Sequence, residues 1–155
     1  MSIEIVKNYF KSNNINKDIL EFPVSSATVE LAAQAAGVEP ARIAKTLSFY
    51  TKDRDAAILV VTAGDKKIDN SKFKHFFGIK ARMLSPEDVE IYTGHAIGGV
   101  CPFANPDSAS IYLDLSLKRF STVFPAAGSA NSAVELTCEE LEKYAHAKAW
   151  VDVCK

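Results

Sequence analysis

Two apolar runs separated by a short polar turn decide the fold. Residues 46–50 read TLSFY, residues 56–63 read AAILVVTA, and the turn KDRD lies between them at residues 52–55. Both runs are rich in β-branched and aromatic residues, which suit a pleated and partly buried surface. Two such runs joined by a short polar segment are typical of a β-hairpin. The stretch therefore predicts two paired strands.

Helical and extended patterns alternate on either side of this hairpin. Thr28 is placed to cap a helix that Gly37 would end, and Thr137 with Glu140 forms a capping box for a late helix. The first predicted helix is capped by Ser2 and ends in the polar residues 12–14. The other predicted helices cover residues 29–36, 70–77, 86–93 and 138–147, with a brief helical turn at 40–44. The predicted strands outside the hairpin cover residues 19–24, 79–84, 110–115, 121–124, 133–136 and 150–153.

This order of elements predicts an α+β fold. Neighbouring strands outnumber strict alternation of strand and helix, which favours a mixed, largely antiparallel sheet curled into a barrel-like core with surrounding helices. A parallel, doubly wound sheet is the alternative. At 155 residues, without internal repeats or a flexible linker, residues 1–155 are expected to form a single domain.

The composition argues against several classes of protein. With 48% apolar and 24% charged residues the chain can bury a core. Its longest apolar run, residues 56–61, is far shorter than a membrane span, and the start of the chain lacks the features of a secretion signal. We therefore expect a cytoplasmic protein with no membrane contact. The three cysteines and three histidines are too scattered for a disulfide framework or a metal site, so we expect no metal and no cofactor.

The net charge of −1 argues against broad, nonspecific coating of nucleic acid. One basic stretch stands out between residues 66 and 82, where cations outnumber Asp65 and Asp69. Two interpretations remain open for it, a solvated helix face and a surface that meets phosphates. Its cations are Lys66, Lys67, Lys72, Lys74, Lys80 and Arg82.

The most unusual local sequence is GGVCP at residues 98–102. Two glycines let a backbone approach a ligand closely, and amide N–H groups in such a loop can stabilise negative charge on a carbonyl oxygen. An ordinary glycine-rich turn is the alternative. Lys45, at the start of the first strand of the hairpin, is a candidate cation for the same site, although a strand-end lysine also commonly lies on the surface.

Other polar residues carry weaker hypotheses. Cys101, six positions after His95, could act as a thiol nucleophile, but a cysteine among apolar residues is more often a small hydrophobic side chain. Residues 128–132 form a loop of small hydrogen-bonding side chains. Asp114 lies inside a predicted strand, where a buried structural hydrogen bond is the favoured interpretation.

Taken in order, four segments resemble the YbaK/EbsC family. They are TVELAA at residues 28–33, IAKTLSF at 43–49, TGHAIGGVCPF at 93–103 and YLD at 112–114, and the resemblance covers residues 28–141. This family includes bacterial trans-editing aminoacyl-tRNA deacylases and is similar to the editing domain of bacterial prolyl-tRNA synthetases. Its sharpest elements here are Lys45 in the K-T-L segment and the G-x-x-x-P loop of residues 98–102. Serine or threonine is common in the family where this chain has Cys101.

The resemblance implies a hydrolase that removes a wrongly attached small amino acid, such as cysteine or alanine, from a transfer RNA. The amino acid would be released from the terminal adenosine of proline tRNA or of another tRNA. The resemblance also implies a metal-free reaction, a charged tRNA 3′ end as partner, an aminoacyl-tRNA synthetase as a further partner, and a monomer or weak dimer. A noncatalytic module that recognises aminoacyl-tRNA or a synthetase, and a cysteine-dependent acyl hydrolase, are the alternatives. The predicted catalytic residues are Lys45, Gly98 and Gly99, and the predicted substrate-binding residues are Thr28, Thr46, Val100, Cys101, Pro102, Gly128, Ser129 and Asn131.

Overall fold

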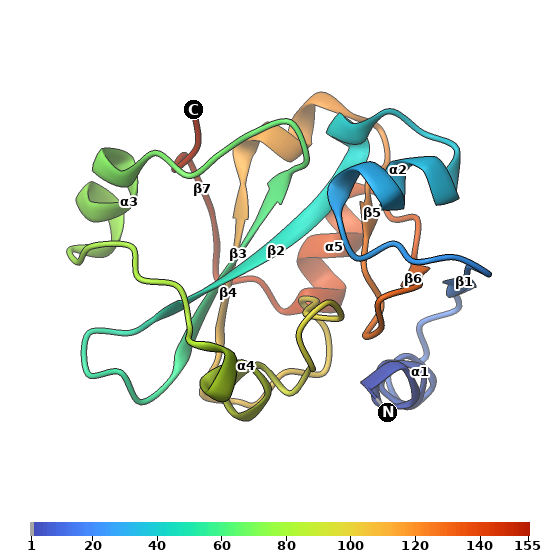
Figure 1. Ribbon diagram of the computed structural model, residues 1–155, viewed down its shortest axis with the longest axis horizontal. Helices are drawn as coiled ribbons and strands as arrows, with labels where there is room; N and C mark the ends of the chain where they lie inside the picture. Colours follow the sequence, from blue (N-terminus) through green and yellow to red (C-terminus); the bar gives the residue numbers. More distant parts are fainter. Residues whose placement is uncertain (1) are drawn as a thin grey trace.

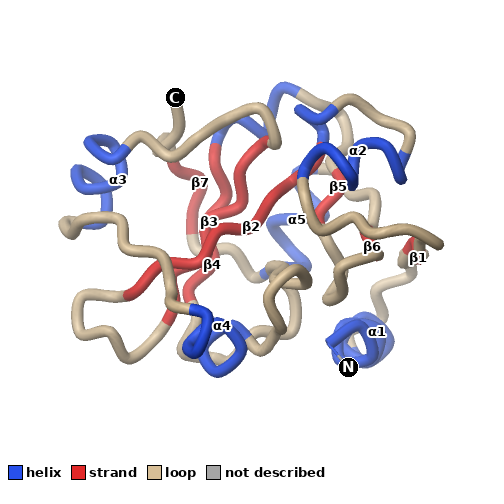
Figure 2. The backbone as a smooth tube through the Cα atoms, in the orientation of Figure 1, coloured by secondary structure: helices blue, strands red, loops and turns tan. Residues whose placement is uncertain are grey.

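The computed structural model describes residues 2–155, in which a five-stranded sheet is surrounded by helices (Figures 1 and 2). None of the helices in that range combines the length and the apolar character needed to cross a membrane. The helices are α1 (Ser2–Ser12), α2 (Val29–Ala36), α3 (Asn70–Phe77), α4 (Pro86–Thr93) and α5 (Cys138–Ala145), with 3-10 turns η1 (Pro40–Arg42) and η2 (Leu115–Arg119). The strands are β1 (Leu20–Glu21), β2 (Ile43–Tyr50), β3 (Ala57–Ala63), β4 (Ser110–Asp114), β5 (Phe124–Pro125), β6 (Ser132–Ala133) and β7 (Ala149–Val151).

The predicted hairpin is confirmed and forms the middle of the sheet. Strands β2 and β3 pair antiparallel with Lys45 opposite Thr62, and the strand order is β5-β2-β3-β4-β7. The mixed α+β class is confirmed, but the expected predominance of antiparallel pairing is wrong. In the described chain β2 with β5, β3 with β4 and β4 with β7 are all parallel. The sheet is also open, because its edge strands β5 and β7 do not pair with each other.

Strand β3 holds the core together because all of its residues are buried. Successive side chains on a strand point to opposite faces. Leu59 and Val61 therefore pack into the larger apolar cluster, whereas Ile58 and Val60 pack into a second cluster with Phe73 of α3. A run that is apolar at every position except Thr62, rather than alternately, reflects this burial on both faces.

The predicted strand at residues 79–84 does not form. This segment meets β2 only through an isolated bridge between Met83 and Phe49 and two hydrogen bonds. The amide of Tyr50 donates to the carbonyl of Arg82 at 2.8 Å, and the amide of Leu84 donates to the carbonyl of Ser48 at 3.1 Å. The other predicted elements outside the hairpin occur at or near their expected places, although the short strands β1, β5 and β6 cover only part of their predicted ranges.

Two predicted caps and Asp114 behave as their sequence contexts indicate. The Thr28 hydroxyl accepts a hydrogen bond from the Leu31 amide at 3.2 Å, which fixes the start of α2. Thr137 and Glu140 form the expected capping box of α5. The buried carboxylate of Asp114 accepts hydrogen bonds from the amides of Ser116 and Val153, both at 2.9 Å, so its role is structural.

Candidate functional site

A gap in hydrogen bonding along the outer edge of β2 is where the site begins. On this edge β5 pairs only with Ile43 and Ala44, and the next backbone contacts begin at Ser48. Backbone groups of alternate residues on a strand point to the same edge. Because Ser48 and Tyr50 use this edge, the N–H and C=O of Thr46 also point outward there, between the two flanking contacts. The edge therefore offers one residue's donor and acceptor to a ligand.

A cavity of about 360 Å³ lies beside this gap. Its size falls within the range of pockets that hold small ligands. Residues 44–48 of β2 and the start of α2 form part of its wall, and most of the remaining wall is apolar. Figure 1 shows β2 running between α2 and α4. The segments that line the cavity come from distant parts of the chain. Further lining residues are Ser26, Ala27, Met83, Leu84, Val89, Ile97, Gly98, Val100, Phe124, Ala126, Ser132 and Ala133.

Lys45 lines this cavity, and its ammonium group is held by the carbonyl of Lys66, a residue outside the lining. The Nζ of Lys45 donates to this carbonyl at 2.5 Å, in the turn that follows β3. That turn is anchored on both sides of Lys66. The carboxylate of Asp65 accepts two hydrogen bonds from Arg119 at 2.6 and 3.0 Å, and the backbones of Lys67 and Lys155 bond to each other. The amine of Lys45 is therefore oriented before any substrate arrives.

Two threonine hydroxyls differ in how they are satisfied. Thr28 lines the cavity, but its hydroxyl is used as the cap of α2. The Oγ1 of Thr46 is buried and has no hydrogen-bond partner among residues 2–155. Leaving a buried hydroxyl without a partner costs about 1–3 kcal/mol. A polar ligand group in the cavity would recover that cost.

The glycine loop contributes alternate residues to the cavity. Gly98 has φ +90° and lines the wall together with Val100, whereas Gly99 is turned away. A Cβ on Gly99 would lie 2.8 Å from the carbonyl oxygen of Gly128, so only glycine lets the two loops approach this closely. The amide of Gly99 donates to the carbonyl of Ala96 at 3.0 Å and is not available to a substrate. Within residues 2–155, the amides of Gly98 and Val100 have no such acceptor.

Cys101 and Pro102, the last two residues of the loop, do not line this cavity. The Sγ of Cys101 is completely buried, 3.4 Å from the Nε2 of His95. Burial raises the pKa of this thiol to about 12. Burial also lowers the pKa of His95, whose Nε2 lies 2.7 Å from the carbonyl of Phe103. The pair is therefore neutral near pH 7, which is unsuited to a thiolate nucleophile.

The loop of residues 128–132 supports the wall rather than forming it. The backbone of Gly128 packs closely against Gly99, and the Oγ of Ser129 lies 2.7 Å from that of Ser132. The side-chain amide of Asn131 donates to the carbonyl of Phe22 at 3.1 Å. Of the loop, only Ser132 lines the cavity.

Several wall residues escaped the sequence reasoning. Met83 and Ile97 line the cavity and are exposed to 58% and 66%. The sequence predicts residue 83 within a strand, and Ile97 carries no chemical group that marks a site. Their signal is visible only in three dimensions, as apolar side chains left open beside a cavity.

Comparison with known proteins identifies the lineage of this arrangement. The model of the aminoacyl-tRNA editing domain matches residues 24–144, which include β2 and the glycine loop. The chain belongs to the aminoacyl-tRNA editing domain family.

Relatives of this editing domain differ in how much of their own length they share with it. The uncharacterized protein YwhH of Bacillus subtilis is 56% identical over 155 residues, which is 100% of this chain and 98% of YwhH. A proline–tRNA ligase of Caldicellulosiruptor bescii is 32% identical over 94 residues, 59% of this chain but only 15% of the ligase. The crystal structure of a proposed trans-editing enzyme for prolyl tRNA synthetase superimposes with a TM-score of 0.89 at 30% identity, covering 99% of this chain and 97% of that one.

Proposed function

We propose that this editing domain is a trans-acting, cytoplasmic hydrolase that removes a small amino acid, such as alanine or cysteine, from a wrongly charged proline tRNA. The observation that carries the proposal is that Lys45, the outward backbone edge of Thr46 and the glycine loop share one small cavity. The links of its relatives to prolyl-tRNA synthesis support the choice of proline tRNA. In this proposal residues 1–155 act as one unit, with no cofactor, and a synthetase releases the substrate to it.

The reaction is the hydrolysis of an ester. Water forms a bond to the carbonyl carbon, the bond from that carbon to the ribose oxygen breaks, and the proton from water passes to the ribose oxygen. Lys45 would bind the substrate through a ribose or carbonyl oxygen, leaving Lys66 as it does so. The amides of Gly98 and Val100 would stabilise the negative oxygen that forms on the carbonyl. Orientation of the ester beside these groups supplies the rest of the catalysis.

The cavity also provides for selection of the amino acid. Its wall beside Thr46 is largely apolar, and its volume leaves room for a small side chain together with part of the ribose. The Thr46 hydroxyl and backbone groups would bind the polar atoms of the aminoacyl group. Because apolar contacts distinguish one methylene by only about 1–3 kcal/mol, overlapping activity on related small amino acids is expected.

The decisive experiment is hydrolysis of purified proline tRNA charged with proline, alanine or cysteine by the wild type and by Lys45→Ala. We expect the wild type to release alanine or cysteine, and Lys45→Ala to lose about 100-fold or more in rate, as when one charge-stabilising donor is removed. Lys143→Ala on the exposed side of α5 is the matched control and should stay active. A wild type that binds charged tRNA without exceeding spontaneous release would reject the hydrolase and favour a binding module.

A further inference from the structure

A second, smaller cavity lies beyond the end of β2. It has a volume of about 150 Å³ and is formed by the β2–β3 turn together with residues 79–82. Four of its lining residues are cations and none is acidic. The cations are Lys52, Arg54, Lys80 and Arg82, and the other lining residues are Tyr50, Thr51 and Ile79.

These four cations are not neutralised by the protein. Elsewhere Arg119 is paired with Asp65 at 2.6 Å, and Lys72 with Asp152 at 3.1 Å. Within residues 2–155, none of the four cations of the cavity lies within 4.0 Å of a carboxylate. Like charges held together repel one another, so the arrangement gains stability only when an anion joins it.

Two nearby carboxylates bond to hydroxyls of the cavity wall rather than to its cations. Asp55 accepts a hydrogen bond from the hydroxyl of Thr51 at 3.0 Å, and Asp88 accepts one from the hydroxyl of Tyr50. Asp53 is exposed on the turn. The guanidinium of Arg54 lies over the ring of Tyr50, 5.4 Å from its centroid, which orients this cation without cancelling its charge.

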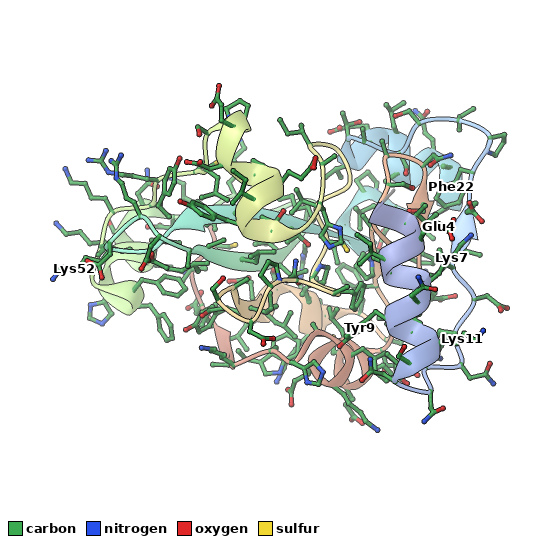
Figure 3. The ribbon with its side chains drawn as sticks, turned by 90° about the horizontal axis from the view of Figure 1, so that it is seen from below. Glu4, Lys7, Tyr9, Lys11, Phe22 and Lys52 are labelled. Atoms are coloured by element: carbon green, nitrogen blue, oxygen red, sulfur yellow. The ribbon has the colours of Figure 1, made fainter. Side chains whose placement is uncertain are left out.

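The basic cavity continues the line of the larger one. Met83 lines the larger cavity, and the adjacent Arg82 lines the basic one. Both belong to the segment that bonds to β2 at Ser48 and Tyr50. At about 3.3 Å per strand residue, Tyr50 lies about 13 Å along β2 from Thr46. Figure 3 places Lys52 at the end of the molecule opposite α1, so the basic cavity opens at this extremity.

We propose that the cavity formed by Lys52, Arg54, Lys80 and Arg82 binds backbone phosphates of the RNA whose aminoacylated end enters the larger cavity. The inference rests on the proposed function and adds the surface that holds the nucleic acid. A polyanion fits because the cations come from two separate segments and lie in line with the larger cavity. In a chain of net charge −1, such a local cluster attracts phosphates without coating the whole protein in RNA.

The test is the salt dependence of binding to uncharged proline tRNA. The double variant Lys52→Ala/Arg82→Ala leaves Arg54 on Tyr50, and it retains the Arg82 carbonyl that pairs with β2. The slope of log K against log salt is negative, and each lost phosphate contact reduces its magnitude by about 0.7–0.9. We therefore expect the double variant to have a slope smaller in magnitude by about 1.4–1.8. The matched control is Lys11→Ala/Lys143→Ala, which removes two exposed cations from α1 and α5. It should keep the wild-type slope.

Kinetics separate this surface from the reaction centre. The double variant should raise KM for aminoacylated tRNA and leave kcat unchanged, and it should hydrolyse aminoacyl-adenosine, which lacks the phosphates, at the wild-type rate. Equal slopes for the double variant and the control would overturn the inference. So would inorganic phosphate that displaces the RNA at micromolar concentration, because the site would then serve the free anion. RNA binding with the expected slopes but no hydrolysis by the wild type would retain this inference and reject the proposed function.

Discussion

Cys101 shows how its surroundings decide the chemistry of a single side chain. Its thiol is completely buried, and burial raises its pKa to about 12, so almost no thiolate exists near pH 7. Since the thiolate is the reactive form, the cysteine-dependent hydrolase suggested by the nearby histidine lacks its nucleophile.

We therefore expect Cys101→Ser to keep its hydrolytic activity. The pH dependence of its stability should differ from that of the wild type in alkali. A thiol whose pKa is raised by folding stabilises the protein fully below pH 9, and this contribution is lost as pH rises from 9 towards 12. Serine does not ionise, so the free energy of unfolding, followed by urea denaturation at pH 7 to 11, should fall less steeply in the variant. A folded but inactive variant would restore the thiol mechanism.

At single positions the sequence predicted which residues line the site better than it predicted the partners of those residues. Lys45 and Gly98 could be proposed because the order and spacing of the K-T-L segment and the G-x-x-x-P loop resemble the family, and both residues line the same cavity. The Lys66 carbonyl that holds Lys45 was not predictable, because any backbone carbonyl looks the same in a sequence. The assignment of Lys45 and Gly98 to catalysis remains a prediction.

At the scale of elements, the two glycine-bearing loops hold each other in place. Gly99 is buried against Gly128, and the missing side chain of Gly99 allows that contact. The neighbouring Gly98 and Val100 then face the cavity. Any side chain at residue 99 would have to displace backbone atoms of Gly128 and Ser129 rather than the flexible end of a side chain.

Gly99→Ala should therefore lower the free energy of unfolding by about 1–3 kcal/mol through overpacking, and should also reduce the rate of ester hydrolysis. Gly78→Ala is the control, because Gly78 has φ +75° and open space around its Cα. It should cost about 1 kcal/mol from its left-handed backbone alone and leave the rate unchanged. Equal loss of activity in both variants would show that loop spacing does not matter.

Helices were easier to predict than strand partners because their signals are local. The cap Thr28 and the stop Gly37 lie within a few residues of the ends of α2. Strand β3 reads as a strand from its own residues, but its parallel pairing with β4 joins residues about fifty positions apart. No local pattern encodes such a pairing, which explains why the sheet was expected to be largely antiparallel.

At the scale of the whole molecule, Asp114 joins three parts of the chain. Its carboxylate receives the amide of Ser116 in η2 and that of Val153 near the carboxyl terminus. The hydroxyl of Ser116 in turn accepts from the amide of Ala63 at the end of β3. The turn containing Lys66 starts there, so the position of Lys45 depends on contacts that reach the end of the chain.

Asp114→Ala should lower the free energy of unfolding by about 2–4 kcal/mol, because the buried amide of Val153 loses its partner. Asp114→Asn keeps one oxygen acceptor and should lose less. Thermal or urea unfolding measures both variants, and Glu139→Ala on the exposed start of α5 is the control for loss of a surface carboxylate. Identical losses for alanine and asparagine would exclude this acceptor role.

The unpaired edge beside Thr46 also bears on how the protein avoids aggregation with other copies of itself. An uncovered sheet margin ordinarily invites strands from other molecules and starts aggregation. Here the exposed length is bracketed by β5 and by the backbone contact at Ser48, which leaves too few successive positions for an incoming strand to gain a ladder. The contacts that leave room for the proposed ester thus leave too short an edge for a strand of another molecule to pair with.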